Sequence, residues 1–263
     1  MTNTILRNDY PSGVVLLTFN RPQRNNSWVP DMDREYFEHM SACESDPSVR
    51  VVVVTGNGKS YCPGVDVLFL SEAGSLELSE RSNKQMPHSY VTQMSKPVIS
   101  AINGICAGFG LAQALMCDIR FASDNAKFST AFAKRGLVAE YGISWTLSKV
   151  VGMSNALDLL LSGRTFLAEE ALSRGLVSAV VPSTDLLTYA LEYATSLAVH
   201  SSPTSMAVIK KQVYSDMFKT LTQSEEDALT LAQESFTRPD FIEGVLSFIE
   251  KRPPNFPPAP ASL

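Results

Sequence analysis

The stretch Pro97–Asp118, with the sequence PVISAINGICAGFGLAQALMCD, decides how the chain is organised. It begins as an extended apolar run, breaks at Asn103-Gly104, passes through Gly108-Phe109-Gly110, and continues as a second apolar segment. This order predicts a strand, a glycine-rich turn and a helix, which together can aim backbone N–H groups at a small pocket. A transmembrane helix is the alternative for so long an apolar run. The glycines, the internal Gln113 and the acidic final residue favour a soluble protein instead.

The composition suits one or two globular domains with a sizeable core, because 44% of the 263 residues are hydrophobic and 19% are charged. The net charge of −5 offers no basic field that would attract nucleic acid. The N-terminal residues contain no apolar run of signal-peptide length, and the four cysteines show no CxxC spacing. We therefore expect a cytoplasmic protein with reduced cysteines. The three histidines are scattered without ligand spacing, so no metal site is expected.

Strands alternate with helices as far as about Val181. Besides the strand in Pro97–Asp118, apolar runs predict strands at Val14–Asn20, Arg50–Thr55, Ile119–Ala122, Lys127–Ser129 and Val177–Val181. Periodicity and helix-end signals predict helical structure from Val29 to Cys43, at Val67–Leu70, in part of Ser75–Met94, and at Ser144–Val150, Ala156–Leu161, Leu167–Arg174 and Ser183–Val199. This alternation predicts an α/β body.

Only helices are predicted in the C-terminal part of the chain. They open at Pro203, Ser224 and Asp240, and Glu243 stands at capping-box spacing from Asp240. The proline-rich tail from Pro253 is expected to be extended or disordered. Apolar residues on two sides of the last helix indicate a face covered by another copy, although a buried helix would explain them equally well.

Two glycine-containing turns precede predicted helices, Gly64-Val65-Asp66 and Gly108-Phe109-Gly110. Each can present N–H donors where the helix dipole favours negative charge. Two convergent N–H groups form an oxyanion hole, which stabilises a carbonyl oxygen as it gains charge. The glycines can equally relieve tight packing, and spacing alone leaves both interpretations open. The chain has no GxxxxGK[ST], GxSxG or HExxH motif, and its GxxxGxG is not the dinucleotide-binding order.

Four segments resemble the enoyl-CoA hydratase/isomerase, or crotonase, superfamily: Asn20–Asn26, Ser60–Leu70, Lys96–Ser123 and Ser162–Pro182. The similarity continues in order to FIEKRPPNF near the C-terminus. It implies a crotonase-like ββα spiral core that binds acyl-CoA over residues 1–200, and a C-terminal helical trimerisation region with a proline-rich tail over residues 201–263. It also implies action on acyl-CoA thioesters, with coenzyme A carried by the substrate and no other cofactor.

The resemblance assigns roles to both turns. The oxyanion-hole donors would be the N–H groups of Val65 and Phe109. The residues that it places along the CoA and pantetheine path or in the substrate pocket are Gln23, Arg24, Asn25, Gly64, Asp66, Val67, Leu68, Gly108 and Tyr141. The side chain of Phe109 would narrow the pocket without removing its N–H. Tyr141 could donate a hydrogen bond or simply pack, and the sequence leaves this open.

Two departures from the family pattern bear on the reaction. Ala112 and Phe132 stand where the hydratases carry their two glutamates. Hydration by the two-glutamate route needs one group to activate water and another to deliver a proton to the α-carbon. Neither alanine nor phenylalanine can do either. We expect these two side chains to form an apolar wall that disfavours hydration.

Glu140 is the one carboxylate left in this neighbourhood. Its position resembles the single acidic residue of the peroxisomal-type Δ3,Δ2-enoyl-CoA isomerases and of a phenylacetate-pathway isomerase. A lone base there would remove a proton from C2 of a 3-enoyl thioester and return it to C4. The apolar neighbours of Glu140 are expected to raise its pKa, which helps a base that must also donate. Without the resemblance, Glu140 is better explained as an acidic helix-entry residue; with it, catalysis is favoured.

The sequence thus predicts an acyl-CoA double-bond isomerase of fatty-acid metabolism. The alternatives are an enoyl-CoA hydratase, another thioester enolate reaction such as C–C cleavage, and a non-catalytic member that binds a CoA ester. The basic pairs Lys210-Lys211 and Lys251-Arg252 fit CoA phosphates or solvent better than RNA. The expected partners are an acyl-CoA substrate and further copies of the chain, in a homotrimer or a dimer of trimers, with no nucleic acid and no membrane.

Overall fold

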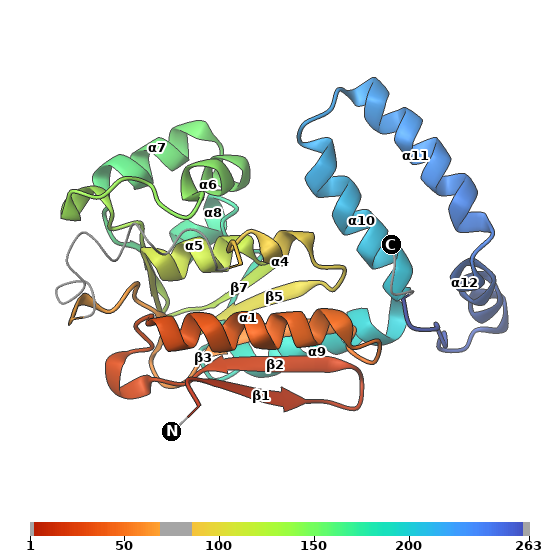
Figure 1. Cartoon of the computed structure of the whole chain (residues 1–263), viewed down its shortest axis with the longest axis horizontal. Coiled ribbons are helices and arrows are strands. Elements are labelled where there is room, and N and C mark those ends of the chain that lie inside the picture. Colours follow the sequence, from red (N-terminus) through yellow and green to blue (C-terminus); the bar gives the residue numbers. More distant parts are fainter. Residues whose placement is uncertain (1–2, 69–85, 260–263) are drawn as a thin grey trace.

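The computed structural model describes residues 3–68 and 86–259. A six-stranded sheet in the order β1-β2-β3-β5-β7-β10 forms the centre of the body (Figure 1). Its strands are β1 (Ile5–Asp9), β2 (Val14–Phe19), β3 (Val51–Gly56), β5 (Val98–Ile102), β7 (Ile119–Ser123) and β10 (Ala179–Val181). β1 runs antiparallel to β2, and every other neighbouring pair is parallel.

A second, four-stranded sheet has the order β4-β6-β8-β9. Its strands are β4 (Ser60–Cys62), β6 (Ile105–Ala107), β8 (Lys127–Ser129) and β9 (Phe166–Leu167). The pairs β3–β4, β5–β6 and β7–β8 each give one strand to the large sheet and one to the small sheet. Helices α4 (Tyr90–Gln93), α5 (Phe109–Met116) and α6 (Ile143–Val151) come after these pairs in turn. This repetition is the predicted ββα spiral.

At strand β3 the large sheet is covered on both faces. Val51 and Val53 pack in one apolar cluster with alanines of α9 (Leu186–His200), while Val52 and Val54 belong to the main core on the opposite face. A strand buried on both faces has an unbroken apolar run instead of alternation, as predicted for this segment. Because α9 presents Ala190 and Ala194 to the sheet, its backbone can approach closely.

Helix α1 (Pro30–Ser45) contributes to the main core. Met32, Tyr36, Met40 and Cys43 are buried at steps of three and four residues, which confirms the predicted periodicity. The four cysteines of the chain are buried and free, as expected. No helix within residues 3–68 and 86–259 is long and apolar enough to cross a membrane.

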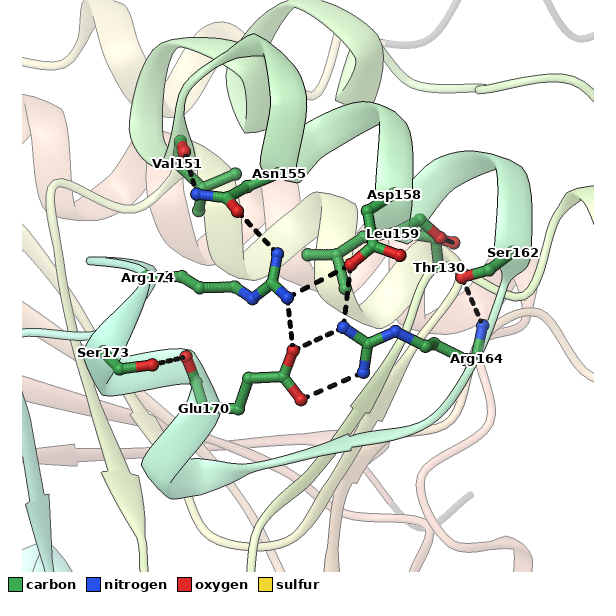
Figure 2. A network of polar contacts seen from close by, with 10 residues as sticks. All are labelled: Thr130, Val151, Asn155, Asp158, Leu159, Ser162, Arg164, Glu170, Ser173 and Arg174. Carbon is green, nitrogen blue, oxygen red and sulfur yellow. Dashed lines mark hydrogen bonds and ion pairs between the residues drawn. The ribbon is translucent and has the colours of Figure 1, made fainter.

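Helices α7 (Met153–Ser162) and α8 (Ala168–Ser173) are joined by a network of charged side chains (Figure 2). Arg164 bonds Asp158 at 2.8 Å, and Arg174 bonds Glu170 at 2.8 Å. Each arginine also pairs with the other carboxylate, so that two cations alternate with two anions. The network fixes α7, whose Leu159 carbonyl accepts a 2.7 Å hydrogen bond from the Thr130 hydroxyl.

The C-terminal helices are α10 (Pro203–Asp216), α11 (Leu221–Phe236) and α12 (Pro239–Glu250), and Figure 1 shows α11 and α12 lying apart from the sheets. The predicted starts at Ser224 and Asp240 were wrong. Thr220 caps α11 in a capping box with Gln223. The expected capping box of Glu243 is absent, because its carboxylate accepts hydrogen bonds from Arg252 and from the Asn255 N–H. The division between residues 200 and 201 remains a prediction.

Other boundaries also needed correction. The stretch Pro97–Asp118 contains a second strand, β6, which was not predicted; β1 and β4 were also missed. β4 and β6 have only three residues each, and strands so short are defined by their partners more than by local sequence. The five-residue β1 carries polar and charged residues at three positions, so its sequence lacks the apolar run of a buried strand. Helix α9 begins later than the predicted Ser183, and Leu167 belongs to β9 instead of α8.

Some predicted segments reach outside the described residues. Residues 67–68 are helical, whereas 69–70 lie outside the described part. In the predicted partly helical segment 75–94, α4 is described and residues 75–85 are not. Residues 253–259 of the tail have no regular secondary structure, as expected, and residues 260–263 are not described.

Candidate active site

The two glycine turns meet in space although 44 positions separate Gly64 from Gly108. A Cβ on Gly108 would lie 3.9 Å from the Cα of Gly64, and a Cβ on Gly64 would lie 3.8 Å from the nitrogen of Phe109. Gly64 has a φ of 117° and Gly108 a φ of 51°. Side chains are strained at such angles, so the backbone conformation requires both glycines.

Each turn leaves a backbone N–H unoccupied. Phe109 is the first residue of α5, and its N–H has no carbonyl four residues earlier within the helix. At the other turn, Trp28 N–H donates to Gly64 O at 2.8 Å and Asp66 N–H donates to Trp28 O at 2.9 Å, an arrangement that leaves out the Val65 N–H. In the part of the chain that the structure describes, neither the Val65 nor the Phe109 amide donates a hydrogen bond. Two free donors on facing turns are suited to binding an oxyanion.

The Phe109 side chain is enclosed by aromatic rings. Its ring centroid lies 4.7 Å from that of Trp28, 4.8 Å from that of Tyr141 and 4.8 Å from that of His88. Phe109 is only 2% exposed. Tyr141 packs edge-on against it from a left-handed backbone conformation, with a φ of 56°. Strained positions of this kind cluster at functional sites. The structure therefore packs Tyr141 against Phe109.

Ala112 and Phe132 lie in the same apolar core as Phe109. Ala112 follows one turn after Gly108 in α5, and its N–H donates to the Gly108 carbonyl at 3.1 Å. Both side chains are buried. Both positions are therefore apolar and closed to water, and the predicted wall beside the substrate stays a prediction.

Glu140 lies half-buried in the loop before α6 and directly precedes Tyr141. Burial raises the pKa of its carboxyl above the usual glutamate range. Within residues 3–68 and 86–259, the Glu140 carboxylate forms no ion pair that could offset this desolvation. Its backbone carbonyl accepts a hydrogen bond from Ile143 N–H at 3.1 Å, which fixes the entry into α6. A carboxyl with a raised pKa can both accept and return a proton.

Asp66 is saturated by protein partners. It accepts a 2.7 Å hydrogen bond from the Ser27 hydroxyl and one of 3.1 Å from Leu68 N–H, and it pairs with Arg24 at 3.1 Å and Arg21 at 3.3 Å. Burial alone would raise the pKa of Asp66, but the hydrogen bonds from Arg24, Ser27 and Leu68 lower it overall. Asp66 therefore fastens the loop at residues 21–27 to the turn that carries Val65.

The remaining residues predicted to line the CoA path lie around this ion pair. Gln23, Arg24, Val67 and Leu68 are exposed, and Asn25 is half-buried with a left-handed φ of 52°. They form an accessible rim beside the turn that carries Val65. Exposure is what a contact with the long CoA arm requires.

Sequence reasoning missed Trp28, Asp33 and His88. Asp33 is an acidic residue in the first turn of α1, where the helix dipole alone explains it, and His88 is one of the three scattered histidines. In the structure Asp33 accepts a 3.0 Å hydrogen bond from the Trp28 indole N–H and lies 3.5 Å from His88 Nε2. Burial lowers the pKa of His88, and the negative charge of Asp33 opposes this effect. No local signal links His88 to Trp28 and Asp33, which lie more than 50 residues earlier in the chain.

Two free amides on facing turns of a ββα spiral define an α/β protein of the crotonase type. The family description "Enoyl-CoA hydratase/isomerase" matches residues 9–258. The chain belongs to the enoyl-CoA hydratase/isomerase family.

Some of the relatives are named isomerases and others hydratases. The chain is 35% identical over 253 residues to 1,2-epoxyphenylacetyl-CoA isomerase from Escherichia coli K12, an alignment that covers 93% of this chain and 95% of that protein. The crystal structure of an enoyl-CoA hydratase, EchA12_1, from Mycobacterium marinum is 47% identical with a TM-score of 0.72, covering 83% of this chain and 100% of that one. An enoyl-CoA hydratase from Bacillus anthracis superposes with a TM-score of 0.91 at 26% identity, covering 97% and 99%.

Proposed function

We propose that this protein is an acyl-CoA double-bond isomerase that uses Glu140 as its proton shuttle. The observation that supports the proposal is the half-buried Glu140, which directly precedes Tyr141, whose ring packs against Phe109. Ala112 and Phe132, at the two positions where the hydratases carry glutamates, are buried and apolar. A double-bond shift needs one group that takes a proton and gives it back. Hydration by the two-carboxylate route needs two.

In the proposed reaction the N–H groups of Val65 and Phe109 bind the thioester carbonyl oxygen of a 3-enoyl-CoA. Glu140 removes a proton from C2, and the electron pair of that C–H bond forms a C1–C2 double bond while the carbonyl oxygen becomes an oxyanion. The two N–H groups stabilise this dienolate. When the carbonyl re-forms, the electron pair of the C1–C2 double bond moves to form a double bond between C2 and C3. The electron pair of the former C3–C4 double bond then binds the proton that Glu140 returns to C4. The product is a 2-enoyl-CoA, and the carboxylate is regenerated.

The second candidate is enoyl-CoA hydration in fatty-acid β-oxidation. The relative that is 47% identical to this chain is named a hydratase, which favours this candidate. It would require Glu140 to activate water without a second carboxylate at position 112 or 132. A third candidate, from another class, is a member that binds a CoA ester without turnover.

Two parallel absorbance assays of the conjugated enoyl thioester distinguish these candidates. With a 3-enoyl-CoA, isomerisation raises the signal; with a 2-enoyl-CoA, hydration lowers it. For the wild-type protein we expect a rise in absorbance with the 3-enoyl-CoA and little loss of absorbance with the 2-enoyl-CoA. Glu140→Gln should abolish the rise. Glu169→Gln, an exposed glutamate on α8, is the matched control and should retain full activity. Efficient loss of the 2-enoyl signal would refute the isomerase mechanism, and calorimetric binding of both thioesters without turnover would support the non-catalytic member.

We also propose that the chain assembles as a homotrimer or a dimer of trimers through α11 and α12. Large apolar side chains on these helices are exposed, among them Leu229 at 67%, Phe248 at 85% and Ile249 at 68%. Exposed large apolar side chains gathered on two helices are typical of an oligomer interface. Sedimentation velocity would show a monomer if the proposal is wrong. The four free cysteines support a cytoplasmic location, and the reaction needs no cofactor beyond the CoA of its substrate.

A further inference from the structure

One buried carboxylate holds two aromatic side chains from different parts of the chain. Asp33, which is 8% exposed, accepts the Trp28 indole N–H at 3.0 Å. The same oxygen, Oδ1, lies 3.5 Å from His88 Nε2. An acidic residue in the first turn of α1 is favoured by the helix dipole, but the dipole alone does not require burial. Burying a carboxylate is costly unless it is paired and hydrogen-bonded. Trp28 supplies the hydrogen bond, and the ring nitrogen of His88 is close enough to pair with Asp33 when the imidazole is protonated.

Both of these rings rest on Phe109. The centroid of Trp28 lies 4.7 Å from that of Phe109, and the centroid of His88 lies 4.8 Å from it. Tyr141 completes the enclosure, 4.8 Å from Phe109 and 5.4 Å from His88. Three rings therefore fix the side chain of Phe109, and Asp33 fixes two of the three.

The imidazole is kept in this enclosure at a cost. His88 Nδ1 is buried and has no hydrogen-bond partner within the described residues. A buried polar atom without a partner costs free energy, which a phenyl ring of similar shape would avoid. A histidine at this position can contact Asp33 through Nε2, and an apolar ring could not make that contact.

We propose that Asp33 is a positioning residue for the oxyanion hole, holding Trp28 and His88 against Phe109 so that the Phe109 N–H points at the thioester oxygen. The inference rests on the enolate chemistry proposed above. Asp33 touches no reacting atom; it acts through the two rings. Because an oxyanion-hole donor must lie within a fraction of an ångström of its productive position, a loosened Phe109 would cost rate more than ground-state binding.

The test compares Asp33→Ala and Asp33→Asn with wild type. The matched control is Asp31→Asn, in the same helical turn, whose side chain is 66% exposed and pairs with Arg34. Two readouts are used: kcat and KM for a 3-enoyl-CoA, and the ultraviolet absorbance of the enolate formed by bound acetoacetyl-CoA. The enolate signal reports on the oxyanion hole without requiring turnover.

We expect Asp33→Ala to lower kcat about tenfold or more and to weaken the enolate signal, with KM within about twofold of wild type. Asp33→Asn should lie between Asp33→Ala and wild type, because an amide oxygen can still accept the Trp28 N–H but carries no charge for His88. Asp31→Asn should match wild type. A merely structural role for Asp33 would lower stability but leave kcat per folded enzyme and the enolate signal unchanged.

Two further variants keep the inference testable should Asp33→Ala fail to fold. Trp28→Phe removes the indole N–H and keeps a ring, and His88→Phe keeps a ring without the contact to Asp33. Each should weaken the enolate signal. If the folded Asp33 and ring variants all keep the wild-type signal and kcat, the positioning role is overturned while the proposed function stands. If wild type itself gives neither enolate absorbance nor isomerisation, the proposed function is wrong, and this inference falls with it.

Discussion

Gly110 lies so close to the carbonyl oxygen of Cys62 that a Cβ on Gly110 would stand 2.1 Å from it. The same Cβ would lie 2.8 Å from the Cβ of Cys62. Helix α5 therefore packs directly on β4. This contact sets the distance between the turn that carries Val65 and the turn that carries Phe109.

Gly110→Ala should consequently be strongly destabilising. Because the clash is with backbone, relief requires α5 to move away from β4, and we expect a loss of about 3 kcal/mol in the free energy of unfolding. Gly152→Ala is the control, since a Cβ there meets nothing within 4 Å and only its φ of 79° is unfavourable. Its expected cost is about 1–2 kcal/mol. Urea denaturation of both variants measures the difference, and equal losses would contradict the packing argument.

Glu140→Gln should stabilise the protein at high pH while abolishing isomerisation. Because burial raises the folded-state pKa of Glu140 above its unfolded value, the charged carboxylate costs stability above the folded pKa, and this cost disappears below the unfolded pKa. We expect a gain of less than about 1 kcal/mol at about pH 8, since the group is half-exposed, and no gain near pH ~4. Thermal unfolding at both pH values tests this, and a Gln variant less stable than wild type at high pH would show that Glu140 has a stabilising partner.

Asp66→Asn should loosen the loop at residues 21–27. The carboxylate loses its charge-assisted bonds with Arg21 and Arg24, and we expect a loss of about 2 kcal/mol at neutral pH. Because the folded-state pKa of Asp66 is lowered, this stabilisation is present above the ordinary aspartate pKa and is lost as the pH falls through the folded value. Denaturation midpoints across the acidic range provide the measurement. Asp9→Asn, at an exposed pair with Arg7, is the control and should change little.

Lys210→Met should detach α10 from the body. The buried Lys210 ammonium lies 2.8 Å from Asp118 Oδ2 and donates to the carbonyl oxygens of Val91 and Lys96. The expectation that Lys210 meets CoA phosphates or solvent was therefore wrong. Its removal leaves Asp118 without its cation, and breaking a buried pair in this way costs about 3 kcal/mol. The neighbouring Lys211 is exposed, so Lys211→Met should stay within about 0.5 kcal/mol of wild type. Similar denaturation midpoints for the two variants would show that the buried pair does not anchor α10.

Local sequence accounts for the parts of the fold that depend on burial alone. The run of valines in β3 predicted a strand covered on both faces, and the periodicity from Met32 to Cys43 predicted the buried side of α1. Helix starts that depend on a particular capping contact were less predictable. Ser224 and Thr220 are both acceptable cap residues, and only the observed bonds of Thr220 with Gln223 show which is used.

For the candidate site, the sequence by itself determined which chemical groups are present: Glu140, two glycine turns, and apolar residues at 112 and 132. Only the tertiary structure decided that the turns of Gly64 and Gly108 meet, and that the rings of Trp28, His88 and Tyr141 enclose Phe109. It also placed Asp33 against Trp28 and His88. The physical reason is that hydrophobic burial leaves a local, periodic pattern in the chain, which one sequence reveals. Contacts between distant residues leave no such pattern, because they depend on how the spiral brings its successive turns together.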